Sequence, residues 1–451
     1  METIFSEFKK QALNAELGKL NVLVSPVASG KSYAITQQIA NYCIEKMGIE
    51  LLIISQPLLS IWKDEDKERL KKQGLKEYKS FEEICLELFS GTFQKGFILT
   101  TPNTLGEYIK SSKNDLPKMV LKSLRDKAAV FIDEVHYHSV SNFANYEFCK
   151  GKATNKNNQF KFFNKGLLSI SKYTKNFWGF SATPHKEIVN QMYDGLEVDY
   201  RDVTTDRANR LIWSKPTDVV LLEDAYECIP SKVLSLINFN FSSNQDKKTA
   251  MFQCRTQKSQ NFKLDEVLIE VCLGIPEEYR NERFIIVDTS ESTYSISPKE
   301  ILEKEYAYQY EKEIIDQEEV YRRLQSPDSP EQLLFCVEKH QLGSNIPTLS
   351  EIFSFKEFNY EYAGNIYIDK LIQLYGRGVR VNLNQEYADY TRNLYELYTS
   401  LLEEGELERI MDLNSCTINL IKNPYTEYFK EWHSKNAVTP EFVRNILEKL
   451  K

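Results

Sequence analysis

Short apolar runs alternate with longer charged or mixed stretches along the first half of the chain. Each run is followed at once by polar residues, and the stretches between the runs have the composition of helices. Runs without internal polar positions are typical of strands that are buried on both faces, and their alternation with helices predicts a mostly parallel sheet. The runs lie at 22–24, 50–57, 96–105, 128–134 and 176–184, and the helical stretches at 1–20, 32–47, 60–90 and 116–127.

The same alternation resumes in the second half, after a break near 200–220 that has the composition of a linker. Strands are predicted at 248–254, 283–288 and 332–337, and helices at 264–273, 300–324 and around 370–375. Residues 385–451 have helical Leu and Tyr periodicity with little strand signal. We therefore expect an α/β protein with two tandem α/β domains, 1–205 and 206–385, followed by a small C-terminal helical extension, 386–451.

A phosphate-binding loop is predicted between the first strand and the first long helix. The stretch 21–33 reads NVLVSPVASGKSY, so that Ser29, Gly30, Lys31 and Ser32 stand where a loop enters a helix. Backbone N–H groups and the helix N-terminus can then face phosphates, the lysine can reach the β- and γ-phosphates, and the serine can bind magnesium. Ser25 and Ala28 occupy positions at which glycine is common.

The polar residues that follow the other strands are expected at the same edge of the first sheet. In open α/β sheets, ligands bind beyond the carboxyl ends of the strands. The loop, Asp133, Glu134 and the Ser181–Thr183 turn should therefore converge on one crevice.

Composition narrows the class of protein. The chain has 451 residues, with 42% hydrophobic and 27% charged residues and a net charge of −8. No apolar run has the length of a membrane span, and the N-terminus has no apolar signal-peptide core. The eight cysteines show no paired spacing, which disfavours a zinc site or a disulfide framework and points to a reducing cytoplasm.

Charge is unevenly distributed along the chain. Residues 1–205 carry 28 Lys and Arg against 24 Asp and Glu, whereas the remainder is acidic. An acidic total does not exclude a nucleic-acid enzyme, because a local groove needs few phosphate contacts.

Three further motifs make the prediction specific. The strand at 128–134 continues as Phe131-Ile132-Asp133-Glu134-Val135-His136. Ser-Ala-Thr follows at 181–183, and residues 373–380 read QLYGRGVR. With the phosphate loop, these motifs resemble in order and spacing those of the superfamily 2 helicases, in a DEVH variant of the DEAD/DEAH box. The resemblance covers about 20–385 and implies two RecA-like P-loop domains that bind and hydrolyse ATP.

The resemblance also implies a role for each motif residue. Ser32 and Asp133 would bind magnesium, and Glu134 would orient and deprotonate the attacking water. Gln373, Arg377 and Arg380 would act from the second domain on the γ-phosphate, the two arginines as arginine fingers. His136, Ser181 and Thr183 would couple the state of the nucleotide to the grip on nucleic acid.

Contacts with nucleic acid are expected along the polar ends of other strands and on a basic segment. By resemblance, Ser55, Gln56, Thr100, Thr101 and Arg255 would touch the backbone of one strand lying across both domains. Residues 148–186 hold eight lysines and no acid, with interleaved aromatics. Lys161 and Lys165 of this segment are candidate contacts, although a solvated loop followed by an amphipathic helix explains the same pattern.

The expected function is an ATP-dependent helicase or translocase, with DNA preferred over RNA and with no membrane association. The alternative is a nucleic-acid-gated ATPase clamp, or a binding subunit of a restriction, phage-defence or replication complex, that unwinds nothing. The acidic segment 386–451 would suit a protein partner.

Overall fold

The computed structural model divides the chain into two compact units, Met1–Thr205 (unit 1) and Asp206–Lys451 (unit 2). Each is described by itself. The residues described are 4–26, 29–56, 64–101, 116–135, 171–182, 186, 189–190, 196–203, 214–223, 225–243, 246–256, 259–289, 291–303, 313–337, 346–358, 361–362, 365–366, 368–380, 394–401 and 407–449.

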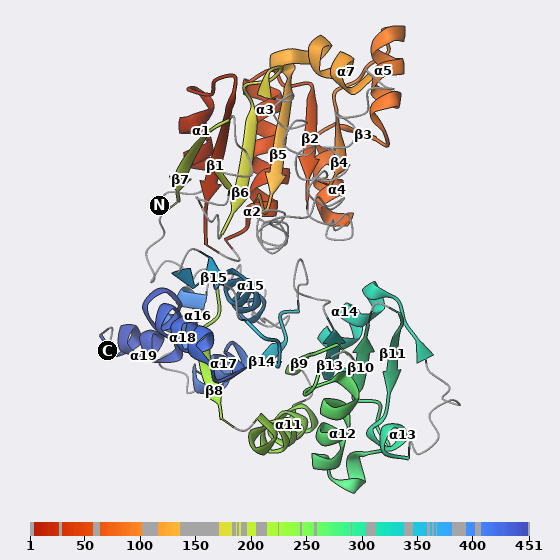
Figure 1. Cartoon of the computed structure of the whole chain (residues 1–451), viewed down its shortest axis with the longest axis vertical. Helices are drawn as coiled ribbons and strands as arrows, with labels where there is room; N and C mark the ends of the chain where they lie inside the picture. Colours follow the sequence, from red (N-terminus) through yellow and green to blue (C-terminus); the bar gives the residue numbers. More distant parts are fainter. Residues whose placement is uncertain are drawn as a thin grey trace, which may run out of the picture. The chain divides into compact units, whose positions relative to one another are not determined.

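Unit 1 is built on a seven-stranded parallel sheet in the order β3-β4-β2-β5-β6-β1-β7 (Figure 1). The strands are β1 (Lys19–Val24), β2 (Leu51–Ser55), β3 (Lys76–Tyr78), β4 (Gly96–Thr100), β5 (Ala128–Asp133), β6 (Phe177–Ser181) and β7 (Glu197–Asp202).

Helices cover both faces of this sheet. One face packs on α5 (Phe81–Ser90) and α7 (Leu116–Leu124), the other on α1 (Ile4–Ala12), α4 (Asp64–Lys72) and the helix that follows β1. That helix runs as α2 (Lys31–Tyr33), a π-helical segment (Ala34–Ile39) and α3 (Ala40–Lys46). Successive residues of each central strand enter opposite cores: Leu51 and Ile53 face α5 and α7, whereas Leu52 and Ile54 face the other set. Both faces need apolar side chains, which explains the uninterrupted runs in the sequence.

Unit 2 contains an eight-stranded sheet in the order β12-β11-β10-β13-β9-β14-β17-β8. Six strands are parallel and β11 and β12 extend the edge in antiparallel fashion. The strands are β8 (Thr217–Leu222), β9 (Thr249–Cys254), β10 (Ile285–Asp288), β11 (Thr293–Ile296), β12 (Glu313–Ile314), β13 (Leu333–Val337), β14 (Leu349–Ser354) and β17 (Cys416–Ile421), with a separate hairpin of β15 (Glu361–Tyr362) and β16 (Asn365–Ile366).

The helices of unit 2 pack on this sheet and on one another. They are α11 (Ala225–Ser242), α12 (Leu264–Gly274), α13 (Pro298–Leu302), α14 (Gln317–Gln325), α15 (Asp369–Gly378), α16 (Leu394–Ser400), α17 (Leu407–Leu413), α18 (Pro424–Asn436) and α19 (Pro440–Glu448). One core joins α11, α12 and α13 to the sheet, and a smaller apolar cluster joins α16, α17 and α19. The predicted α/β architecture of parallel sheets flanked by helices is confirmed.

Three predictions for individual segments are wrong. The segment 386–451 is not purely helical, because β17 lies between β14 and β8 in the sheet. The expected helix at 300–324 is interrupted: α13 ends at Leu302, and α14 begins after Asp316, whose carboxylate accepts the Glu319 N–H. The break at 200–220 includes the ends of two strands, β7 and β8, which carry exposed or partly exposed residues and therefore lack the apolar run of a central strand.

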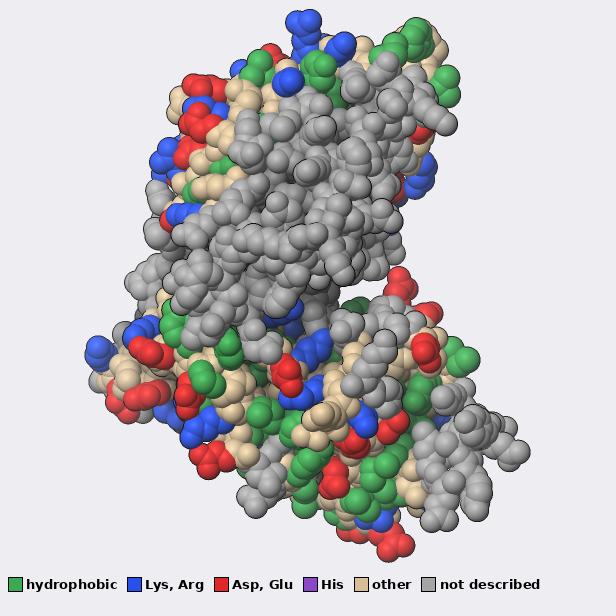
Figure 2. All heavy atoms as spheres, viewed as in Figure 1, with side chains coloured by type: hydrophobic (Ala, Val, Ile, Leu, Met, Phe, Trp, Pro, Cys, Tyr) green, Lys and Arg blue, Asp and Glu red, His purple; other side chains and the backbone are tan. Residues whose placement is uncertain are grey.

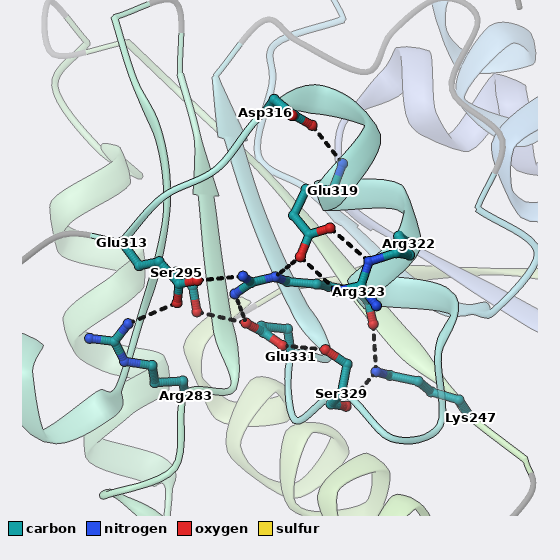
Figure 3. Close-up of polar contacts among 10 residues, drawn as sticks. All are labelled: Lys247, Arg283, Ser295, Glu313, Asp316, Glu319, Arg322, Arg323, Ser329 and Glu331. Atoms are coloured by element: carbon teal, nitrogen blue, oxygen red, sulfur yellow. Dashed lines mark hydrogen bonds and ion pairs between the residues drawn. The ribbon is translucent and has the colours of Figure 1, made fainter. Parts of the chain in front are cut away.

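A buried ion-pair network ties α14 to the strands beside it (Figure 3). The Arg323 guanidinium donates to Glu331 at 2.8 Å and to Glu319 at 2.6 Å, and it also contacts Glu313. Burial disfavours the charged Glu331 carboxylate, but donation from Ser329 and Arg323 more than offsets this, so the pKa of Glu331 is lowered. The network therefore stabilises unit 2 only while Arg323 is present.

Replacing Arg323 with Met should destabilise unit 2 by about 3 kcal/mol, because it leaves the 2% exposed Glu331 carboxylate without its guanidinium. Hydrogen exchange of the β10 and β13 amides measures the loss. The lowered pKa means that the stabilisation is present at neutral pH and is lost as the pH falls through the folded-state pKa, so the difference from wild type should shrink in acid.

Arg322 is the matched control, since it is exposed and pairs with Glu319 alone among the interactions resolved for it. Arg322→Met should leave the stability of unit 2 nearly unchanged, because an exposed ion pair contributes little. An equal loss in both variants would contradict the network's role.

Candidate nucleotide-binding site

The strand order of unit 1 brings three of the predicted motifs to one edge of the sheet. Strand β6 lies between β1, which leads into the predicted phosphate loop, and β5, which ends at Asp133. The Ser25 N–H donates to the Ser181 carbonyl at 3.0 Å, and the Val135 N–H donates to the Phe180 carbonyl at 3.0 Å. The predicted convergence of these strand ends is thus observed, while the roles of the residues stay predictions.

The loop turns into its helix at Gly30, which has the left-handed φ of 76°. A Cβ there would meet no atom within 4 Å, so backbone strain alone selects glycine. The Lys31 ammonium donates to the Pro26 carbonyl at 3.5 Å, and the Ser29 hydroxyl donates to the Ser25 hydroxyl at 3.1 Å. These contacts fold the loop back on itself at the N-terminus of a helix, where N–H groups suit an anion.

The helix after the loop contains a π-helical segment that is held from outside. The Ala40 N–H donates to Ile35 rather than to Thr36, so the Thr36 carbonyl instead accepts from the Gln73 amide at 2.8 Å. The Thr36 hydroxyl lies 2.8 Å from the Ser32 carbonyl and 3.4 Å from Asp66. π-Helical turns occur often at functional sites, and here the turn directly follows Ser32.

Helix α4 supplies these outside contacts, which the sequence did not reveal. Asp66 is 6% exposed and pairs with Arg69 at 2.6 Å, while the Arg69 guanidinium lies 5.3 Å from the centre of the Tyr33 ring. In sequence, α4 is only a charged stretch without a motif. Its partners on the phosphate-loop helix become apparent only once the two helices pack together.

Asp133, which is buried, and Glu134, which is partly exposed, form an acidic pair at the end of β5. Asp133 is 5% exposed, and its Oδ1 accepts the Glu134 N–H at 3.0 Å. The pKa of Asp133 is raised to about 7, mainly by burial and secondly by the Glu134 charge, while Lys31 opposes the rise. Glu134 has a φ of 49°, a conformation that few residues other than glycine adopt and that is found at functional sites.

The residues predicted to contact nucleic acid at the ends of β2 and β4 are largely covered. Ser55, Gln56 and Thr100 are 0%, 1% and 3% exposed, and Thr101 is partly exposed. The Gln56 side chain donates from Nε2 to Asp133 Oδ2 at 3.3 Å. Gln56 therefore contacts Asp133 in this structure, and no motif in the sequence indicated that contact.

The candidate residues of unit 2 lie at two places. Arg377 is 6% exposed in the last turn of α15, and Gln373 and Arg380 are partly exposed. Arg255 follows β9 and donates to the Phe355 carbonyl at 2.6 Å and to Glu357 at 2.8 Å. Figure 2 shows acidic and basic side chains interspersed over the described surface of both units.

Several predicted residues lie outside the described part of the chain. These are His136, Thr183, Lys161, Lys165 and most of the basic segment 148–186, together with Ala28 of the loop. Their roles stay predictions.

The oxygen donors at this edge fit a magnesium ion. Magnesium is bound by one or two carboxylates together with phosphates and waters, and Ser32 and Asp133 offer one hydroxyl and one carboxylate. The buried Oε1 of Gln56, next to Asp133, has no hydrogen-bond partner among the described residues. The described residues contain no group of three or more His, Cys, Asp or Glu that could hold a metal by themselves, so phosphate oxygens would have to complete the site.

Comparison with known proteins identifies the fold. No family model and no curated protein matches the chain. Among solved structures, the chain is similar to the DUF1998 helicase MrfA bound to DNA, with a TM-score of 0.53, 14% identity, and coverage of 96% of this chain and 51% of that one. It is also similar to the DEAD-box helicase Mss116 bound to ssRNA and UDP-BeF, with a TM-score of 0.50, 10% identity, and coverage of 97% and 73%.

The chain therefore has the fold of superfamily 2 helicases, with two RecA-like domains, as the motifs predicted. It spans about half the length of the MrfA chain. None of the helices in the described part of the chain is long and apolar enough to cross a membrane.

Gly30→Ala should weaken binding of an adenine nucleotide about fivefold, because the left-handed conformation costs a residue with a Cβ about 1 kcal/mol and the loop shifts to relieve it. Fluorescence titration with a labelled nucleotide measures the change. Gly91→Ala is the matched control: its φ is 72°, a Cβ there also meets nothing within 4 Å, and it caps α5. Equal nucleotide affinity in the two variants would show that the loop does not hold the ligand.

Proposed function

We propose that the protein is an ATP-dependent helicase or translocase that moves along nucleic acid. One observation carries the proposal: strand β6 is hydrogen-bonded on one side to the strand that leads into the Lys31 loop and on the other to the strand that ends in Asp133 and Glu134. This pairing puts the predicted phosphate-binding loop next to two adjacent carboxylates, as ATP hydrolysis requires.

Within unit 1, the groups have separate tasks. Lys31 and the N–H groups at the start of the helix bind the β- and γ-phosphates, and Ser32 and Asp133 hold magnesium. When bound, the magnesium neutralises charge that develops on the phosphates. Glu134 orients the attacking water and accepts its proton.

Unit 2 completes the reaction in this proposal. Arg377 and Arg380 act as arginine fingers on the γ-phosphate, and Gln373 orients the water or the phosphate. A guanidinium can contact two phosphate oxygens at once, which a lysine cannot. His136, Ser181 and Thr183 couple nucleotide state to the grip on nucleic acid. In this grip the strand is contacted by Thr101, Arg255, Lys161 and Lys165.

DNA is the proposed substrate, with RNA as the alternative. The motif set lacks the D-E-A-D box and the upstream glutamine motif of RNA DEAD-box proteins. Among the similar structures, MrfA is bound to DNA and Mss116 to ssRNA. Both nucleic acids therefore belong in the test.

ATP turnover should rise at least about tenfold when single-stranded DNA is added, because hydrolysis requires the two domains to close on a strand. Lys31→Ala should abolish turnover, and Glu134→Gln should abolish it while nucleotide binding is retained. Steady-state phosphate release with DNA, with RNA and without nucleic acid measures this.

Turnover in Lys31→Ala equal to that of wild type would refute the ATPase. Turnover that depends on Lys31 but not on nucleic acid would refute the helicase and translocase. Stimulated turnover without strand displacement would separate a translocase or clamp from a helicase.

Arg380→Lys should lower kcat about a thousandfold, by the usual magnitude for an arginine finger, with nucleotide affinity changed only a few-fold. Arg322→Lys, at an exposed position of unit 2, is the control and should retain full turnover. Full turnover in Arg380→Lys would remove this residue from the mechanism.

A further inference from the structure

Gln56 ends β2 with its side chain buried against the acidic pair. Its backbone N–H donates to the Thr100 carbonyl at 3.0 Å, which continues the pairing of β2 with β4. Its Nε2 donates to Asp133 Oδ2 at 3.3 Å. Only 1% of the residue is exposed, so in this structure the amide can act on Asp133 but cannot reach a nucleic-acid strand.

The contact with Asp133 fixes which way the amide faces. A carboxylate that binds a metal is ionised and can only accept hydrogen bonds, so in the proposed site Asp133 must face the amide nitrogen and not the amide oxygen. Oε1 consequently points away from Asp133 Oδ2. This oxygen is buried and has no donor among the described residues.

A buried acceptor without a donor is destabilising, because it has lost its hydrogen bond to water. The cost disappears if a bound species supplies the donor. Magnesium keeps several of its waters when carboxylates and phosphates bind it, and its charge makes those waters strong donors. An amide that holds the ligating carboxylate with its nitrogen can accept from such a water with its oxygen.

We propose that Gln56 is a positioning residue of the magnesium site: Nε2 fixes the Asp133 carboxylate, and Oε1 accepts a hydrogen bond from a metal-bound water. The assignment rests on the proposed function, since the metal arrives with the nucleotide. It replaces the nucleic-acid contact that the sequence motif implied for Gln56. Partners of this kind typically change metal affinity 10- to 100-fold.

The test titrates MgCl₂ against binding of a fluorescent ATP analogue and needs no turnover. Gln56→Met should raise the half-saturating Mg²⁺ concentration about tenfold and leave the affinity measured in EDTA unchanged. Gln56→Glu keeps an acceptor oxygen but loses the donor, so its half-saturating Mg²⁺ concentration should lie between those of wild type and Gln56→Met. It is also the second variant if Gln56→Met folds poorly.

Asn176→Leu is the matched control in the same unit. Asn176 is 2% exposed at the start of β6, its Nδ2 donates to the Asp126 carbonyl at 3.2 Å, and its Oδ1 has no partner among the described residues. It lies at the amino end of its strand, away from Asp133. The substitution should lower stability without shifting the Mg²⁺ titration.

A Mg²⁺ titration of Gln56→Met that matches wild type would overturn the inference, as would an equal shift in Asn176→Leu. Weaker binding of single-stranded DNA by Gln56→Met without nucleotide, with no Mg²⁺ shift, would restore the nucleic-acid role instead. Lys31→Ala separates the two proposals. If it binds the analogue like wild type, the proposed function fails; if it does not, and Gln56→Met titrates normally, only this inference fails.

Discussion

The pairing of β1, β6 and β5 is the constraint on which the candidate site depends. Both faces of the sheet in unit 1 are covered by helices, so its central strands must be apolar throughout. Polar and charged groups can then appear only where the strands end. Because the three strands are parallel, their polar ends meet at one edge, and the phosphate loop, Asp133 and Ser181 become neighbours without any of them being close in sequence.

This arrangement has an electrostatic cost. Asp133 and Glu134 are adjacent acids at a covered edge, and burial together with mutual repulsion raises the pKa of Asp133. Lys31 and the Gln56 amide offset part of that cost within unit 1. A cation and a bound phosphate would change the balance most, because they would place opposite charges beside the two acids and the lysine. The buried charge of Asp133 therefore favours the binding of a cation at this edge.

The sequence allowed the strands of the cores and the motif positions to be predicted, because both follow local rules. Uninterrupted apolar runs identified β2, β4, β5 and β6, and the loop was identified by its Gly30-Lys31-Ser32 string. Several strands were missed. Among them, β7 is an exposed edge strand, and β17 lies within a segment of helical periodicity. The position of a strand in a sheet depends on the strands with which it pairs, and a local sequence pattern does not indicate those partners.

The same holds for the candidate site: residues in local motifs could be predicted, whereas residues that reach it through long-range contacts could not. Motif spacing identified Lys31, Asp133 and Glu134, but it could not identify Asp66 or Gln73, whose contacts cross from α4 to the phosphate-loop helix. Gln56 illustrates this difference best. Its motif predicted a contact with nucleic acid, whereas its side chain contacts Asp133. Strand β2 ends at Ser55, and Gln56 directly follows it. Strands β5 and β4 lie on either side of β2. A motif fixes where on the sheet edge a residue stands, whereas the neighbouring strands decide which ligand it can reach.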